Sequence, residues 1–88
     1  MANKHFIQAS THPTATIHLG SFEVPCSVLS STGATAHVRV VTTGGIPEHL
    51  TFVRDGEARR ARVVLRKQGP LGLDLWLDLQ VVQHARAA

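Results

Sequence analysis

Arginine is the residue type whose number and spacing in this chain most clearly suggest chemistry. Residues 54–67 hold six basic side chains against Asp55 and Glu57, a local charge of 6 − 2 = +4; the basic residues are Arg54, Arg59, Arg60, Arg62, Arg66 and Lys67. In a regularly alternating strand, Arg60, Arg62 and Arg66 would share one face. Such a stripe can contact nucleic acid, a nucleotide, an anionic membrane or an acidic protein, although a solvated strand face has the same composition. We therefore treat these three arginines as a candidate contact face.

The other polar residues do not indicate catalysis or metal binding. Cys26 shares a strand face with Val24 and Val28, where a thiol behaves as a small hydrophobic group. The six histidines form no HxxxH or HxH pair and have no CxxC companion. The carboxylates show no paired arrangement of the kind that acid–base catalysis uses. We expect no enzyme activity, no metal site and no cofactor.

Binding of single-stranded nucleic acid requires aromatic side chains next to basic ones, because bases stack on the aromatic rings. The chain has three Phe, one Trp and no Tyr, and none interleaves with the arginines of residues 58–67. Only the basic half of the pattern is present. Nucleic-acid binding is therefore an alternative and not the main expectation.

Alternation of apolar and polar residues dominates the chain and predicts strands. The residues expected to face inward are Ala15, Ile17 and Leu19; Val24, Cys26 and Val28; Ala36, Val38 and Val40; Leu50 and Phe52; and Ala61, Val63 and Leu65. Turn residues separate these segments: Gly20-Ser21, Gly44-Gly45 before Pro47, Asp55-Gly56 and Gly69-Pro70. Five or six short strands predict an all-β fold, a small antiparallel barrel that is closed or nearly closed, since closure removes exposed sheet edges.

The C-terminal residues carry a mixed pattern. Leucines at 71, 73, 75, 77 and 79 alternate as in a strand, with Trp76 on the opposite face. Leu75, Leu79 and Val82 also satisfy helical spacing, and QVVQHARAA contains good helix formers. We expect a strand over about residues 71–77 and leave open whether a strand or a short helix follows. The leucines either fill the core or leave an apolar contact surface for a partner or a second copy.

The length and composition predict a single small globular domain. The chain has 88 residues and a net charge of +3. It has no apolar run near the ~18 residues of a membrane helix, and MANKHFIQASTHPTA lacks the pattern of a signal peptide. One cysteine allows no intrachain disulfide, which fits a reducing compartment. We expect a cytoplasmic protein without a membrane span.

Four stretches, CSVLSSTGA, GGIPEHLTF, DGEARRARVVLR and GLDL, occur in an order and spacing that resemble a small bacterial PilZ domain. The family has an [Asp/Asn]-x-Ser-x-x-Gly turn, followed by a small residue, between two strands, and an Ile/Leu-Pro pair before a later strand. A strand that carries arginines and Val-Val and a terminal Gly-x-x-Phe-like strand follow. The matching residues here are Ser30, Gly33 and Ala34; Ile46 and Pro47; Arg62, Val63, Val64 and Arg66; and Gly72. The resemblance implies a six-stranded β-barrel, often with a C-terminal helix. It divides the chain into an N-terminal arm, residues 1–13, and a barrel domain, residues 14–88.

The best-known activity of PilZ domains is binding of cyclic di-GMP, a bacterial second messenger. The resemblance implies that the turn and an Arg-x-x-x-Arg motif before the first strand hold this ligand. Arginine offers a planar fork for phosphate and guanine, and Asp or Asn accepts hydrogen bonds from guanine. Here Lys4 and Gln8 stand at the arginine positions and Val28 at the Asp/Asn position, while Ser30 and Gly33 match. These five residues define a degenerate ligand site, because the fork, one charge and the acceptor are missing.

Two function classes follow from this comparison. The first is a PilZ-like adaptor in a pathway linked to cyclic di-GMP, which binds the dinucleotide weakly or not at all and acts through a protein partner. The second is a true cyclic-di-GMP receptor with a non-standard site. A small basic barrel that binds single-stranded nucleic acid is a further alternative. The choice depends on whether SSTG, Ser30 to Gly33, is only a turn or part of a ligand site.

Overall fold

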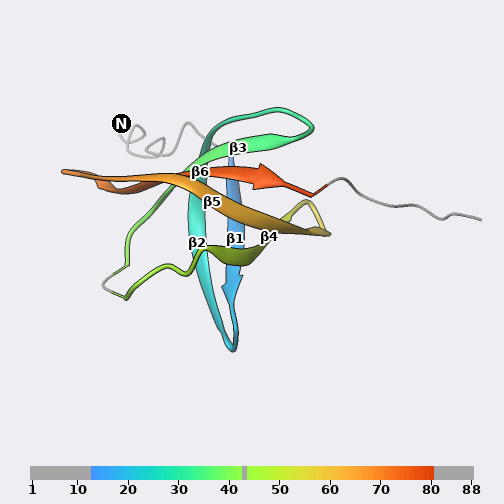
Figure 1. Cartoon of the computed structure of the whole chain (residues 1–88), viewed down its shortest axis with the longest axis horizontal. Helices are drawn as coiled ribbons and strands as arrows, with labels where there is room; N and C mark the ends of the chain where they lie inside the picture. Colours follow the sequence, from blue (N-terminus) through green and yellow to red (C-terminus); the bar gives the residue numbers. More distant parts are fainter. Residues whose placement is uncertain (1–12, 43, 81–88) are drawn as a thin grey trace, which may run out of the picture.

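The computed structural model describes residues 13–42 and 44–80, which form a closed barrel of six antiparallel strands (Figure 1). The strands are β1 (Thr14–Leu19), β2 (Phe22–Ser31), β3 (Thr35–Val40), β4 (His49–Arg54), β5 (Glu57–Gly69) and β6 (Gly72–Leu79). They are arranged in the order β1-β2-β3-β6-β5-β4, and the barrel closes where Ile17 on β1 lies opposite Phe52 on β4. The predicted all-β fold and the six-stranded antiparallel barrel are confirmed. Among the described residues no helix is long and apolar enough to cross a membrane.

The interior of the barrel is filled by alternate residues of every strand, as the period of two predicts. Ile17, Val38 and Leu75 are completely buried, and they come from three different strands. The remaining buried residues are Ala15, Cys26, Val28, Ala36, Val40, Ile46, Leu50, Phe52, Ala61, Val63, Leu77 and Leu79. Leu19 and Val24 are only partly buried and pack against the edge of this cluster. The sequence pattern therefore located most of the core correctly.

Two of the predicted hairpin turns have the backbone geometry that their residues suggest. Gly20, in the turn between β1 and β2, has a φ of 71°. Asp55 and Gly56, between β4 and β5, have φ values of 54° and 80°. Positive φ at both central positions is what a type I′ turn requires, and Asp-Gly supplies it at low cost. These two hairpins are set by local turn chemistry.

A β-bulge in β5 changes which side chains face the core. Val63 lies opposite Leu77, but Leu65 lies opposite Trp76, so Val64 is an extra residue. The prediction that Leu65 faces inward is wrong, because its side chain is on the outer face and 57% exposed.

The same bulge divides the predicted arginine stripe. Directly opposed residues of an antiparallel pair lie on one face of the sheet. Arg66 lies opposite the buried Leu75, whereas Arg62, between the buried Ala61 and Val63, points outward. Arg60 and Arg62 therefore share the outer face, and Arg66 is on the other one. The expectation of one face for all three arginines is wrong.

The end of the chain continues as a strand further than predicted. β6 extends to Leu79, two residues beyond the expected end at 77, and Leu75, Leu77 and Leu79 are all buried. Leu71, in the turn between β5 and β6, is 69% exposed. Most of these leucines thus fill the core. The short helix considered after this strand, like the arm before residue 13, falls on residues outside the described ranges.

The hairpin of β5 and β6 extends beyond the part of the sheet in which β5 also pairs with β4. β5 pairs with β4 from Glu57 to Arg62, and the N–H of Val63 donates to the carbonyl of Glu48 at 2.7 Å. Its pairing with β6, in contrast, continues to Gly69. Figure 1 shows the tip of this hairpin projecting beyond the barrel. Residues 64–69 of β5 consequently have a strand neighbour on one side only within the described part of the chain.

Candidate functional site

The loop between β2 and β3 closes on its own hydrogen bonds. The N–H of Thr32 donates to the carbonyl of Thr35 at 2.9 Å. The Thr32 hydroxyl Oγ1 accepts hydrogen bonds from the N–H groups of Ala34 and Thr35, at 3.1 and 3.0 Å. This is the arrangement by which a threonine side chain stabilises a turn. The polar groups of Thr32 are therefore occupied by the turn itself.

Gly33 is not required by the backbone geometry of this loop. Its φ is not among the positive ones, and a Cβ at this position would meet no atom within 4 Å. Ser31 is engaged as well, since its hydroxyl accepts a hydrogen bond from Arg54 Nη1 at 2.9 Å. Ser30 is exposed on β2, opposite His37. Of the SSTG residues, Ser30 and Gly33 are thus the ones that the turn does not use.

Val28 lies in the hydrophobic core. Its side chain is only 3% exposed and its residue is opposite the fully buried Val38. A second β-bulge follows at once: Ser30 lies opposite His37, so Leu29 is an extra residue in β2. Val28 and Ser30 are consequently on different faces of the strand. Lys4 and Gln8 are outside the described residues. Of the other three predicted ligand residues, Ser30 and Gly33 belong to the hairpin of β2 and β3, and Val28 points into the core.

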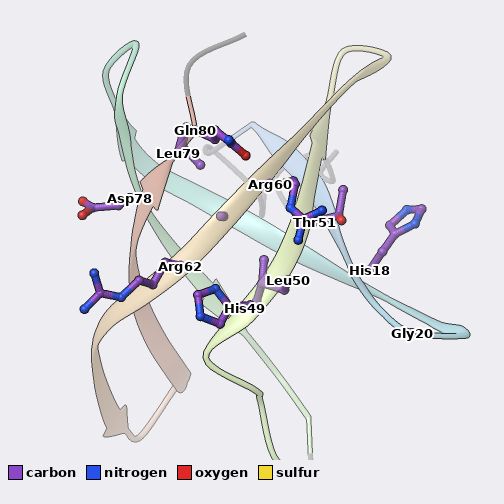
Figure 2. Close-up of a pocket in the computed structure, with 11 residues that line it drawn as sticks. His18, Gly20, His49, Leu50, Thr51, Arg60, Arg62, Asp78, Leu79 and Gln80 are labelled. Carbon is purple, nitrogen blue, oxygen red and sulfur yellow. The ribbon is translucent and has the colours of Figure 1, made fainter. Parts of the chain in front are cut away.

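A groove of about 490 Å³ crosses the outer side of the barrel over β1, β4, β5 and the end of β6 (Figure 2). Thr51 is flanked by His18 and Arg60 on the neighbouring strands, and Arg62 is flanked by His49 and Asp78. The full lining is His18, Gly20, His49, Leu50, Thr51, Arg60, Ala61, Arg62, Asp78, Leu79 and Gln80. Two of the three predicted contact arginines therefore lie in one groove, together with histidines that the sequence analysis had not connected to them.

The charge of this groove is nearly balanced. Arg62 Nε lies 3.1 Å from Glu48 Oε2, an exposed ion pair, and Asp78 stands opposite Arg62. Arg60, in contrast, has no ion pair among the described residues. In an exposed ion pair the attraction is weak but the charges still cancel for a distant ligand. Arg60 is thus the groove arginine with a side chain free to take an anion.

Arg66 has a different role. Its Nη1 donates to the carbonyl of Ile46 at 2.6 Å. Ile46 is a buried residue of the connection between β3 and β4. Arg66 therefore holds this connection against the hairpin of β5 and β6.

A polar cluster on the outer face of β3 and β6 was not predicted. Arg39 Nε donates to Asp74 Oδ1 at 2.7 Å and Arg39 Nη2 donates to Asp74 Oδ2 at 3.3 Å. His37 Nε2 lies 3.1 Å from Asp74 Oδ2, and the His37 ring stacks on Trp76 with centroids 4.1 Å apart. The hydrogen bond from Arg39 lowers the pKa of Asp74 and raises the pKa of Arg39 itself. Finding this cluster from sequence would have required the register between β3 and β6.

The register also shows which residues flank Trp76 on the neighbouring strands. It stands between His37 on β3 and Leu65 on β5 in one row across the sheet. His37 stacks on one face of the indole, and Trp76 also lines a hollow of about 390 Å³ together with Arg39 and Lys67. The row thus combines two stacked rings with one exposed apolar side chain, Leu65.

Cys26 is the one cysteine of the chain, and it lies in the core. Cys26 is buried, and burial raises the pKa of its thiol to about 11. Such a thiol is protonated near pH 7 and is a poor nucleophile. Among residues 13–42 and 44–80, no group of three or more His, Cys, Asp or Glu is placed to hold a metal ion.

Comparison with known proteins adds no relative. No family model, no curated protein and no solved structure matches this chain.

Proposed function

We propose that this chain is a PilZ-like adaptor domain in a signalling pathway linked to cyclic di-GMP, acting through protein contacts and binding the dinucleotide weakly or not at all. One observation carries the proposal: Val28, at the position of the guanine acceptor in the family pattern, is packed in the core at 3% exposure. An apolar side chain offers no hydrogen bond, and a buried position offers the ligand no access. The resemblance to PilZ domains rests on the sequence motifs given above.

The β2–β3 loop supports the same conclusion. Thr32 uses its hydroxyl and its N–H within the turn, and Ser31 accepts from Arg54. A ligand would have to displace these hydrogen bonds or be limited to Ser30 and the backbone around Gly33. Few free donors and acceptors face solvent where the family pattern places the guanine.

The departures from the PilZ pattern at three positions should weaken the affinity for cyclic di-GMP by an amount that follows from the lost contacts. At Lys4 and Gln8 two forked arginine contacts are missing, and at Val28 one acceptor is missing. Each loss costs about 1.5–3 kcal/mol for a charge-assisted hydrogen bond. Two such losses weaken a micromolar site by roughly two to four decades, since about 1.4 kcal/mol is a factor of ten.

A protein-binding role is supported by apolar side chains exposed around the β5–β6 hairpin. Val64, Leu65 and Leu71 are 46%, 57% and 69% exposed, and Trp76 lies beside Leu65. Exposed apolar patches mark interaction sites, and Trp and Arg are enriched among the residues that contribute most to protein interfaces. The proposal assigns no catalytic activity. It includes a cytoplasmic location, since a single cysteine suits a reducing compartment.

The second candidate is a cyclic-di-GMP receptor with a non-standard site, and the groove favours it. Arg60 has no ion pair among the described residues and lies next to Thr51, with His18 on the far side of Thr51. An unpaired arginine and two histidines could bind a phosphate group. Nucleic-acid binding is the third candidate, and the separation of Arg66 from Arg60 and Arg62 weakens it.

Calorimetric titration of the whole chain with cyclic di-GMP tests the proposal. We expect any dissociation constant for cyclic di-GMP to be weaker than about 100 μM, two decades above that of a micromolar receptor. The titration should therefore show no saturable heat at micromolar concentrations. The Arg60→Gln variant, titrated in parallel, identifies the second candidate. Micromolar binding by the wild type that disappears in Arg60→Gln contradicts the adaptor proposal and supports a receptor that uses the groove.

A further inference from the structure

The outer half of β5 has a free backbone edge. Residues 64–69 pair with β6, but the pairing with β4 ends at Arg62 and the single bond of Val63 to Glu48. No strand of the described chain lies along the other edge of residues 64–69, where the β3–β4 connection is bound through the Arg66 side chain, which donates to the Ile46 carbonyl. This edge of β5 is an unpaired row of N–H and C=O groups, longer than the one-sided stretch of β2 over residues 22–25, which pairs with β1 only. Such a row is a template for a further strand.

The side chains of this edge are apolar and basic. Val64 and Leu65 are exposed, as are Arg66, Lys67 and Gln68. Lys67 lies opposite Asp74, but that carboxylate is bound by Arg39 and His37, and Lys67 has no ion pair among the described residues. Arg66 donates to a neutral carbonyl, so its charge is not cancelled there. The edge therefore carries two uncompensated positive charges beside two exposed apolar groups.

These charges decide which strand the edge can accept. A second copy that paired symmetrically with residues 64–69 would bring Arg66 and Lys67 close to the same residues of its partner, and opposed like charges destabilise a strand pair. The chain's own terminal segments offer no compensation, since residues 1–12 and 81–88 contain no Asp or Glu. An acidic strand from another protein removes the repulsion and gains attraction.

We propose that residues 64–69 of β5 receive an extended segment of a partner protein in which acidic and apolar residues alternate. The added strand would supply main-chain hydrogen bonds to the free edge, as in β-strand addition. After the bulge, Leu65 and Lys67 lie on the outer face with Trp76, and Arg66 lies on the opposite face. Alternation puts all acidic residues of the partner on one face, where they would pair with Lys67, and its apolar residues on the opposite face, beside Arg66. This inference rests on the proposed function, because it requires that the domain acts through a protein.

Two synthetic peptides test the proposal: eight residues of alternating glutamate and valine, and the same length of alternating lysine and valine. Each is titrated into the ¹⁵N-labelled whole chain at low salt, with amide shifts and hydrogen exchange as the readouts. We expect the glutamate peptide to bind with protection of amides within 64–69. We expect the lysine peptide to bind about tenfold more weakly, because its charged face would place like charges beside Lys67.

A matched pair of variants distinguishes binding at the β5 edge from non-specific attraction of an acidic peptide to a basic protein. Lys67→Glu and Arg60→Glu change the net charge equally, but Arg60 is on the part of β5 that β4 covers. Lys67→Glu should weaken binding of the glutamate peptide about fivefold, and Arg60→Glu by less than about twofold. Equal effects of the two variants, equal affinity for both peptides, no binding of the glutamate peptide, or shifts centred on another strand would each overturn the proposal. Concentration-dependent dimerisation that protects residues 64–69 would also overturn it, in favour of a second copy.

The outcome is independent of the dinucleotide titration. Failure of the peptide test with no binding of cyclic di-GMP leaves the adaptor proposal standing with its contact surface elsewhere. Tight binding of cyclic di-GMP overturns the adaptor proposal whatever the peptides do.

Discussion

Arg39 and Asp74 form a two-point contact across β3 and β6, with Nε 2.7 Å from Oδ1 and Nη2 3.3 Å from Oδ2. Their side chains are 31% and 17% exposed, so the pair is partly shielded from water. His37 adds a contact to the same carboxylate at 3.1 Å. Two-point pairs of arginine and carboxylate are stronger and more directional than single contacts. This cluster joins the two strands that a long stretch of chain separates.

The cluster makes stability depend on pH in the acidic range. The pKa of Asp74 is lowered in the folded state by Arg39 and then by His37, so the unfolded state binds its proton first as pH falls. The stabilisation from Asp74 is therefore complete above its unfolded pKa and is lost as pH falls through its folded pKa. Urea unfolding of wild type and Asp74→Asn should show a lower free energy of unfolding for the variant at pH 7 and convergence of the two in acid. A pH-independent difference would contradict this.

Val28→Asp, the substitution that would restore the family's acceptor, should destabilise the barrel. An unpaired carboxylate at a position 3% exposed loses its hydration without gaining a partner. We expect a loss of about 4 kcal/mol or more, a large part of the stability of a small domain. Ser30→Asp is the control, because Ser30 is exposed on the same strand, and its effect should stay within about 0.5 kcal/mol. Chemical denaturation measures both, and a small effect at Val28 would mean that this position can open to solvent.

Two glycines of the family pattern should respond very differently to substitution. Gly72 has a φ of 145°, and a Cβ there would lie 2.7 Å from the carbonyl oxygen of Val40. Gly72→Ala should cost about 3 kcal/mol from strain and overlap. Gly33→Ala should change the free energy of unfolding by less than about 0.5 kcal/mol, since the site is open and its φ is ordinary. A large loss at Gly33 would show that the loop needs glycine after all.

Because Arg66 lies on another face from Arg60 and Arg62, the three arginines cannot all contact one nucleic-acid strand along a single face. Of the three predicted contact arginines, only Arg60 and Arg62 share a face, and Arg62 is paired with Glu48. If these two arginines alone contact a single-stranded oligonucleotide, two phosphates are neutralised. The logarithm of the affinity should then fall with the logarithm of the salt concentration with a slope no steeper than about −1.4. Fluorescence anisotropy at several salt concentrations gives the slope. A value near −2 that becomes shallower in Arg66→Gln would show that all three arginines contact the strand.

The sequence was most informative where the pattern is local. Asp55-Gly56 and Gly20-Ser21 identify their hairpins because their φ requirements are properties of single residues. The alternation places Ile17, Val38 and Leu75 in the core, because side chains of a strand point to opposite faces in turn.

The predictions that failed depend on register. The bulge at Val64 reverses the faces of Leu65 and Arg66, and nothing in RVVLRK distinguishes the bulged residue from its neighbours. The cluster of His37, Arg39 and Asp74 likewise depends on which residues of β3 and β6 stand opposite each other, and these strands are more than thirty residues apart. Long-range pairing of this kind is decided by packing of the whole barrel.

The amide spectrum of the ¹⁵N-labelled whole chain, recorded while cyclic di-GMP is added, tests the central claim most directly. It reports on the β2–β3 loop residue by residue and does not depend on a substitution that could disturb folding. Because Val28 is buried and Thr32 is used by its own turn, we predict that the amides of residues 30–35 stay in place at ligand concentrations that saturate a micromolar receptor. Saturable shifts of these amides in that concentration range would contradict the account and identify the loop as a working ligand site.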